Sequence, residues 1–185
     1  VNAHVKKCFE GIQSLQFEED MTISGMISPE KEPVPLTTRV DPVAANGAVE
    51  KWLVQVEDAM LESIRDQSFQ SRDDYVNSGF VDWVQKWPGQ VVIGIFNLFW
   101  TSEVNEALSE RGNAGLVDYA QKLDDTLTDI VGLVRREIPK LVRCTLEALI
   151  VIFVHNKDTI VDLRDRGTYL VSDFDWLGEL RYFIE

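Results

Sequence analysis

The side chains best placed for acid–base chemistry in this sequence are His155 and Asp158. They follow the apolar run of residues 148–154, and a histidine near a carboxylate can pass a proton to or from a substrate. No nucleophile or second carboxylate stands beside them, so a polar bend in a helix, held by local hydrogen bonds, is the simpler interpretation. An acid–base enzyme that uses His155 and Asp158 remains the less favoured hypothesis.

Metal ligands are sparse. His4 and His155 lie on separate segments, whereas a zinc site needs several ligands that converge. The acidic pairs Glu18-Glu19 and Asp124-Asp125 lack the alternating oxygen ligands and the glycine of a calcium loop. We expect solvated faces at these pairs and no metal site in the chain.

A phosphate site has equally little support. Gly89 and Gly94 have the spacing that begins a phosphate-binding loop, but Ile95 and Phe96 stand where the lysine and the hydroxyl belong. Without those two groups nothing grips a phosphate or its magnesium ion. We therefore expect no catalytic residue and no bound cofactor in these residues.

The charge of the chain opposes polyanionic partners. Its 18 Lys and Arg residues are scattered and outnumbered by 31 Asp and Glu residues, which gives a net charge of −13, whereas nucleic-acid binders show clustered basic residues. The longest uncharged runs, 91–102 and 148–156, fall short of the ~20 residues that a membrane helix needs. We expect a soluble protein that binds neither nucleic acid nor membrane, with Cys8 and Cys144 reduced.

The elements that must position any site are mostly helical. The 185 residues suffice for one domain, and the sequence reads as a fragment of something longer. Apolar residues recur every three or four positions through most of the chain, which indicates amphipathic helices, while alternation and prolines in the early part indicate strands. We predict a mainly α fold, a helical bundle with one small β-hairpin: a helix at 1–15, the hairpin at 17–40 and the bundle at 46–185.

The densest apolar stretch, residues 87–108, should form the centre of the bundle. Pro88 suits the first helical position, and residues 91–100 have almost no polar face. A buried strand at Val91–Phe96 is the alternative. Flanking segments of helical period and the absence of βαβ alternation favour a core helix.

Five tryptophans mark core or docking positions. Trp52 and Trp100 fall on apolar stripes and should be buried. The others flank segment boundaries, where aromatic residues fill cores but also anchor interfaces, so both roles stay open for Trp83, Trp87 and a terminal group: Phe174, Trp176, Tyr182 and Phe183.

Six short strings follow one another along nearly the whole chain: 6–12 with 15–17, 25–36, 49–57, 87–92 with 100–101, 148–158, and 173–182. Each string is weak alone, but the six in this order are specific. Together they resemble the linker region of dynein heavy chains, in particular the axonemal kind. Three positions depart from the family: Lys31 replaces a glycine usual in the hairpin turn, and Phe183-Ile184 stands where a Tyr and a Trp often follow.

The resemblance implies a mechanical role without catalysis. Such a linker is a helical rod that precedes the first AAA+ module, arches across the AAA+ ring and moves with its nucleotide cycle. ATP and Mg²⁺ would bind in that ring, outside these residues. Implied partners are the ring of the same chain, other dynein subunits and, through the whole motor, microtubules, on the cytoplasmic side in the axoneme of a cilium or flagellum.

Residues at the aromatic boundaries are the candidates for docking on the ring: Phe174, Trp176, Leu180, Arg181, Tyr182, Trp83 and Trp87. A free-standing helical adaptor that binds a partner helix through Trp83 and Trp87 is the alternative from another class.

Overall fold

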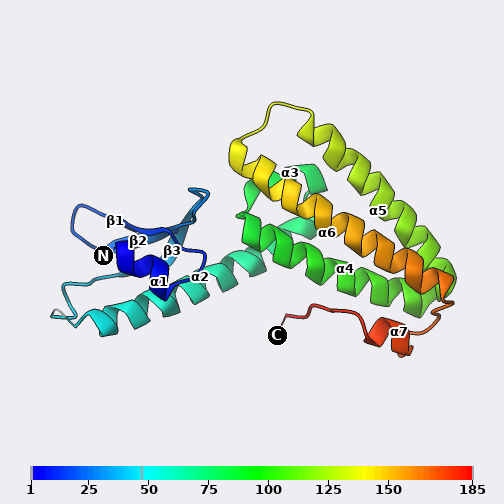
Figure 1. Cartoon of the computed structure of the whole chain (residues 1–185), viewed down its shortest axis with the longest axis horizontal. Helices are drawn as coiled ribbons and strands as arrows, with labels where there is room; N and C mark the ends of the chain where they lie inside the picture. Colours follow the sequence, from blue (N-terminus) through cyan, green and yellow to red (C-terminus); the bar gives the residue numbers. More distant parts are fainter. Residues whose placement is uncertain (1, 47, 185) are drawn as a thin grey trace. The chain divides into compact units, whose positions relative to one another are not determined.

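The computed structural model describes residues 2–46 and 48–184 and is mainly helical, which confirms the expected fold class (Figure 1). The chain falls into two compact units, 1–73 and 74–185. The expectation of a single domain stays a prediction. Positions 1, 47 and 185, which the expected helix 1–15 and bundle 46–185 include, lie outside the described residues.

The first unit contains a three-stranded antiparallel sheet of β1 (Ser14–Phe17), β2 (Ile23–Ile27) and β3 (Pro33–Val40) in that order. The strands β2 and β3 form the expected hairpin, and β1 adds a third strand through pairs such as Leu15 with Met26. Alternate residues of β3, Val34 and Leu36, point into the core. The prediction of a hairpin alone was therefore one strand short.

The helix predicted at 1–15 was too long. Helix α1 spans Asn2–Cys8, and Gly11 then takes a φ of +80°, a left-handed conformation that ends the helix. The backbone N–H of Gln13 donates to the carbonyl of Ile27 at 2.8 Å, which starts the pairing of β1. The side chain of Leu15 is buried as the prediction required, but it reaches the core from a strand.

The turn between β2 and β3 places Lys31 at a φ of 69°. Two backbone hydrogen bonds close this turn, from Lys31 N–H to Ser28 O at 2.9 Å and from Ser28 N–H to Glu32 O at 3.0 Å. The left-handed conformation suits the glycine that is usual there in the family that the sequence resembles. Lys31 thus keeps the turn geometry at a conformational cost.

Helix α2 spans Val49–Asn77 without a break. Its early buried side chains, among them Trp52 and Val56, join α1 and the sheet in one core. The buried Ser63 hydroxyl ties α2 to β3, because it accepts the backbone N–H of Thr37 at 2.8 Å and donates to the carbonyl of Ala59.

The second unit is helical throughout. It contains the end of α2 and helices α3 (Phe80–Lys86), α4 (Gly89–Arg111), α5 (Asn113–Val134), α6 (Lys140–Asp165) and α7 (Phe174–Leu177). The three long helices α4, α5 and α6 pack against one another, and α3 packs against α5 and α6 (Figure 1).

Helix α4 is the core helix that its composition predicts, and the strand alternative at Val91–Phe96 is wrong. Its apolar side chains face neighbours on several sides: Phe96 stacks on Phe153 of α6 with ring centroids 4.3 Å apart. Pro88 is the cap before the first helical residue. A side chain on Gly89 would collide with Thr145 of α6, so this glycine serves helix packing and not phosphate binding.

Candidate functional site

Helix α7 is fixed to α4 by Trp176, whose side chain is 0% exposed. The indole rings of Trp176 and Trp100 meet edge to face with centroids 5.5 Å apart, a favoured geometry for aromatic pairs. The Trp176 Nε1–H donates to Asn105 Oδ1 at 2.8 Å, so its polar atom is also satisfied. Trp176 is therefore a core residue, and it positions the segment around it.

The turn before α7 is organised by Asp173. Its carboxylate accepts the backbone N–H groups of Tyr169 at 2.7 Å and Leu170 at 2.9 Å, and these hydrogen bonds lower the pKa of Asp173. Asp173 also occupies the cap position of α7. The helix begins at Phe174, directly after this carboxylate.

After α7 the chain returns along α4. The backbone N–H of Tyr182 donates to Thr101 Oγ1 at 2.9 Å, and Thr101 in turn donates to the carbonyl of Asn97 at 3.0 Å. A cavity of about 280 Å³ lies beside this contact, lined by α4, α6 and residues 179–182. Two buried donors at its walls, Trp100 Nε1 and Asn156 Nδ2, have no hydrogen-bond partner among the described residues.

Residues 174–184, which we name the terminal aromatic segment, expose much apolar surface. Phe174 is 86% exposed and Leu180 is 71% exposed, with Tyr182 and Phe183 exposed beside them. The Arg181 guanidinium lies 5.9 Å from the ring centroids of both Trp176 and Phe183. Large exposed apolar side chains grouped together are typical of binding surfaces.

The structure separates the residues that the sequence proposed for docking. Trp176 is buried, Phe174, Leu180 and Tyr182 are exposed, and the Arg181 guanidinium lies over the Trp176 ring. The polar groups of α4 that hold this segment, Asn105 and Thr101, were missed, because a polar residue in a helix gives no periodic signal of its distant partners. The terminal aromatic segment is therefore held on α4 by hydrogen bonds to Asn105 and Thr101.

Trp83 and Trp87 belong to α3 and its C-terminal end and serve another purpose. Trp83 is 0% exposed and packs edge to face on Tyr75, with centroids 4.8 Å apart. Trp87 donates its indole N–H to Asp74 Oδ2 at 2.7 Å, and Lys86 lies 3.0 Å from the same carboxylate. An adaptor surface that needs Trp83 exposed is thus contradicted.

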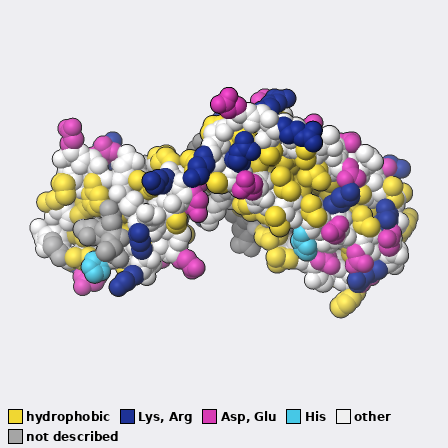
Figure 2. Space-filling view, turned by 45° about the horizontal axis from the view of Figure 1, so that its top comes forward, with side chains coloured by type: hydrophobic (Ala, Val, Ile, Leu, Met, Phe, Trp, Pro, Cys, Tyr) yellow, Lys and Arg dark blue, Asp and Glu magenta, His cyan; other side chains and the backbone are white. Residues whose placement is uncertain are grey.

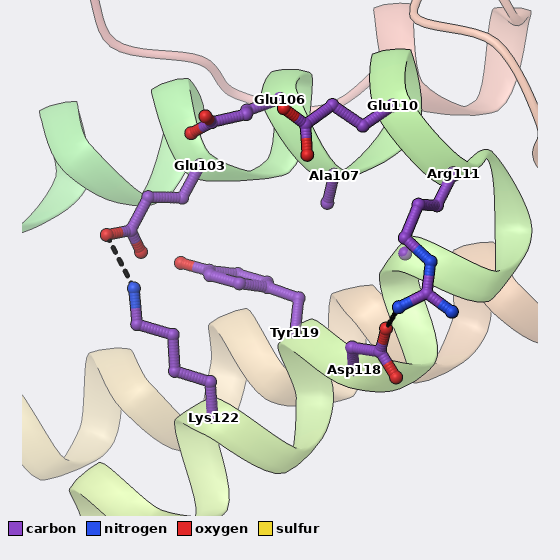
Figure 3. Close-up of a pocket in the computed structure, with 9 residues that line it drawn as sticks. Glu103, Glu106, Ala107, Glu110, Arg111, Asp118, Tyr119 and Lys122 are labelled. Atoms are coloured by element: carbon purple, nitrogen blue, oxygen red, sulfur yellow. Dashed lines mark hydrogen bonds and ion pairs between the residues drawn. The ribbon is translucent and has the colours of Figure 1, made fainter.

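A second cavity, of about 340 Å³, lies between α4 and α5 (Figure 3). Its rim carries three glutamates of α4, and Figure 3 shows the Tyr119 ring lying below Glu103, which pairs with Lys122 at 2.8 Å. Burial, and then the Glu103 charge, raise the pKa of Tyr119 well above its usual value. The phenol therefore stays protonated near neutral pH and is unsuited to act as a base.

The residues of the acid–base hypothesis are not assembled into a site. His155 and Asp158 are both exposed on α6, and His155 but not Asp158 lines the 280 Å³ cavity. In the described part of the chain, no three His, Cys, Asp or Glu side chains are grouped so that they could hold a metal ion. No helix within residues 2–46 and 48–184 has the length and apolar character to cross a membrane.

Known proteins similar to this chain match it over its whole length. Residues 1–71 match the family model described as "Dynein heavy chain, N-terminal region 2". The chain is 49% identical over all its 185 residues to dynein axonemal heavy chain 12 of Rattus norvegicus, covering 6% of that protein. Over 183 residues, 99% of the chain and 4% of each relative, it is 46% identical to dynein axonemal heavy chain 3 and 41% identical to dynein axonemal heavy chain 1, both of Mus musculus.

These matches confirm the resemblance read from the short strings. They reach beyond the family model and include the second unit with the terminal aromatic segment. The chain spans only a small part of the length of these relatives. The chain belongs to the axonemal dynein heavy chains, as a segment of their N-terminal region.

Proposed function

We propose that this segment is a non-catalytic mechanical linker in an ATP-driven, microtubule-based dynein motor, and that it couples the nucleotide state of the AAA+ ring to the power stroke. The observation that carries the proposal is the 49% identity to an axonemal dynein heavy chain over the whole segment. Catalysis would lie outside it, with ATP and Mg²⁺ bound in the ring of the full-length chain.

The packing of the second unit supports a role in transmitting force. Helices α4, α5 and α6 pack against one another along their lengths, and their facing positions are filled by buried side chains such as Phe96, Leu123 and Phe153. Close-packed interiors have low compressibility and transmit strain. A load applied to one of these helices would therefore move the unit as a body.

The terminal aromatic segment is the proposed contact with the AAA+ ring of the same heavy chain. Phe174, Leu180 and Tyr182 expose apolar surface in this segment, and Arg181, over the rings of Trp176 and Phe183, adds a positive charge to it. Trp176 contributes from beneath, because it fixes α7 to α4. Other dynein subunits, microtubules reached through the whole motor, and a location in the axoneme on the cytoplasmic side belong to the same proposal.

The test is made in the full-length heavy chain, with Phe174 and Leu180 changed to alanine. Both side chains are largely exposed, so the fold should tolerate their truncation. We expect ATP-driven microtubule gliding to slow at least about threefold, a loss of about 0.7 kcal/mol in coupling, while ATP hydrolysis without microtubules persists.

A matched control is Leu61→Ala with Val76→Ala, two apolar residues of α2 with similar exposure. These changes should leave gliding velocity unchanged. Unaltered gliding by the Phe174 and Leu180 variant would remove the docking role of the terminal aromatic segment. An isolated 185-residue chain that hydrolyses ATP would contradict the assignment as a non-catalytic linker.

A further inference from the structure

The turn that joins α5 to α6 concentrates positive charge on a strongly acidic chain. Four cationic residues lie within nine positions, Arg135, Arg136, Lys140 and Arg143, with Glu137 among them. We name this stretch, residues 135–143, the basic turn. Lys and Arg side chains (dark blue) gather along the upper edge of the second unit in the space-filling view (Figure 2), whereas the chain as a whole carries −13.

The cations of the basic turn have no carboxylate partner among the described residues, unlike every other cation of the second unit except Arg181. Arg135, Arg136 and Lys140 are exposed and form no ion pair with any described residue. Elsewhere in this unit the cations are engaged, either in ion pairs or, for Arg181, over aromatic rings: Lys86, Arg111, Lys122, Lys157, Arg164, Arg166 and Arg181. Apart from that of Arg181, the positive charge that no described carboxylate neutralises in this unit is thus gathered in the basic turn.

The fourth cation, Arg143, holds the turn in shape. Its guanidinium donates to the carbonyl of Val134 at 3.1 Å and to the carbonyl of Arg136 at 3.4 Å. The N–H of Arg136 adds a bond to Leu133 O at 3.0 Å, and the Leu133 side chain is buried in the bundle. The turn is therefore held in one conformation before any partner binds, which lowers the entropic cost of binding.

We propose that the basic turn is a docking surface for an acidic segment of a partner protein, a short stretch rich in Asp and Glu. The exposed cations come from the end of α5 and the start of α6, so they suit several carboxylates along a chain better than one phosphate group. A long polyanion such as nucleic acid would also meet the negative charge that dominates the rest of the molecule. This surface is independent of the terminal aromatic segment and of the linker role.

The probe is a fluorescent peptide of ten glutamates, and binding to the 185-residue chain is measured by fluorescence anisotropy at about 20 mM salt, where screening is weak. The test variant carries Arg135→Gln, Arg136→Gln and Lys140→Gln. We expect its Kd to rise about tenfold, from the loss of three exposed charge contacts. Circular dichroism and urea unfolding establish that each variant is folded.

The matched control changes Lys6, Lys7 and Lys51 to glutamine. These lysines are also exposed and form no ion pair with a described residue, and the three changes remove as much positive charge as the test variant does. Its Kd should stay within about twofold of the original chain. Equal weakening by both triple variants would mean non-specific attraction and would overturn the proposal.

Two further arms decide the partner class and the role of Arg143. A single strand of ten thymidines should bind more weakly than the glutamate peptide. Tighter binding of the thymidines would overturn the proposal of an acidic protein segment and indicate a nucleic acid as the partner. Arg143→Lys keeps the charge but removes the planar guanidinium that bridges two carbonyls. We expect it to weaken peptide binding about threefold, and unchanged binding would remove the positioning role of Arg143.

Discussion

Lys31 shows how a single residue departs from its family without losing the fold. It occupies the left-handed turn between β2 and β3 with a φ of 69°, and its neighbours close the turn with two backbone hydrogen bonds. A side chain at such a φ is strained by roughly 1–2 kcal/mol, and a glycine there is not. The turn thus accommodates Lys31 in the backbone conformation that suits a glycine.

We predict that Lys31→Gly stabilises the chain by about 1 kcal/mol, because relief of the left-handed strain exceeds the extra entropy of glycine in the unfolded chain. Urea unfolding followed by circular dichroism measures the change. Glu30→Gly is the control, since Glu30 lies in the same turn without a positive φ and should gain nothing. A Lys31→Gly variant no more stable than the original would show that the turn carries no strain.

Asp74 should make the stability of the second unit depend on pH. Its carboxylate accepts hydrogen bonds from Trp87 Nε1 at 2.7 Å and Ser78 Oγ at 2.8 Å and lies 3.0 Å from the Lys86 ammonium. These contacts, that of Trp87 first, lower the pKa of Asp74 below its usual value. A lowered native pKa stabilises the fold above the unfolded value of about 3.9, and the contribution is lost as the pH falls through the native value.

Asp74→Asn should therefore melt below the original chain at pH 7, and the difference should shrink below about pH 3. Thermal unfolding at the two pH values measures it. A difference in melting temperature that is the same at both pH values would mean that charge on Asp74 contributes nothing.

At the scale of elements, helix composition was a better guide than helix spacing. Helix α4 was predictable because residues 91–100 are apolar on all sides and only a surrounded helix buries them all. Residues 1–15 have helical spacing as well, yet Gly11 ends the helix and Leu15 is buried by strand pairing. At Leu15, pairing with another strand and not the local apolar spacing therefore determines the secondary structure.

The candidate site was predictable only in part, for a similar reason. Aromatic crowding near the end of the sequence pointed to Phe174 and Trp176, but it could not separate an exposed side chain from a buried one. That division depends on Asn105 and Thr101, which accept hydrogen bonds from Trp176 and Tyr182 across more than seventy positions. Contacts so distant in sequence leave no local signal.

The crossing of α4 and α5 gives a prediction at this scale. A Cβ atom on Gly115 would overlap the backbone carbonyl of Ala107, so α4 and α5 could not keep their separation. Gly115→Ala should destabilise the chain by about 2 kcal/mol or more. Gly94→Ala is the matched control, because nothing lies within 4 Å of that position in α4, and it should stabilise by about 0.5–1 kcal/mol.

Urea unfolding of both glycine variants checks the pair. Opposite signs would support the close approach at Gly115. Equal destabilisation of the two variants would mean that the approach of the helices is not the cause.

At the scale of the whole chain, the question is whether the two compact units unfold together. Helix α2 is the element that contributes to both, since its 29 residues continue unbroken past the division at Asp73 and Asp74. A helix elongates cooperatively once formed. Unfolding of one unit should therefore also fray the part of α2 that belongs to the other unit. We therefore predict one unfolding transition, which the expectation of a single domain requires.

Alanine substitutions at one buried residue in each unit test this prediction. Val56 in the first unit and Leu149 in the second are both 0% exposed. Val56→Ala should cost about 2 kcal/mol and Leu149→Ala about 3 kcal/mol. In a single transition each variant shifts the whole curve, and circular dichroism and tryptophan fluorescence give coincident midpoints. Two separated transitions, each moved by only one of the variants, would instead show that the units are independent domains joined by α2.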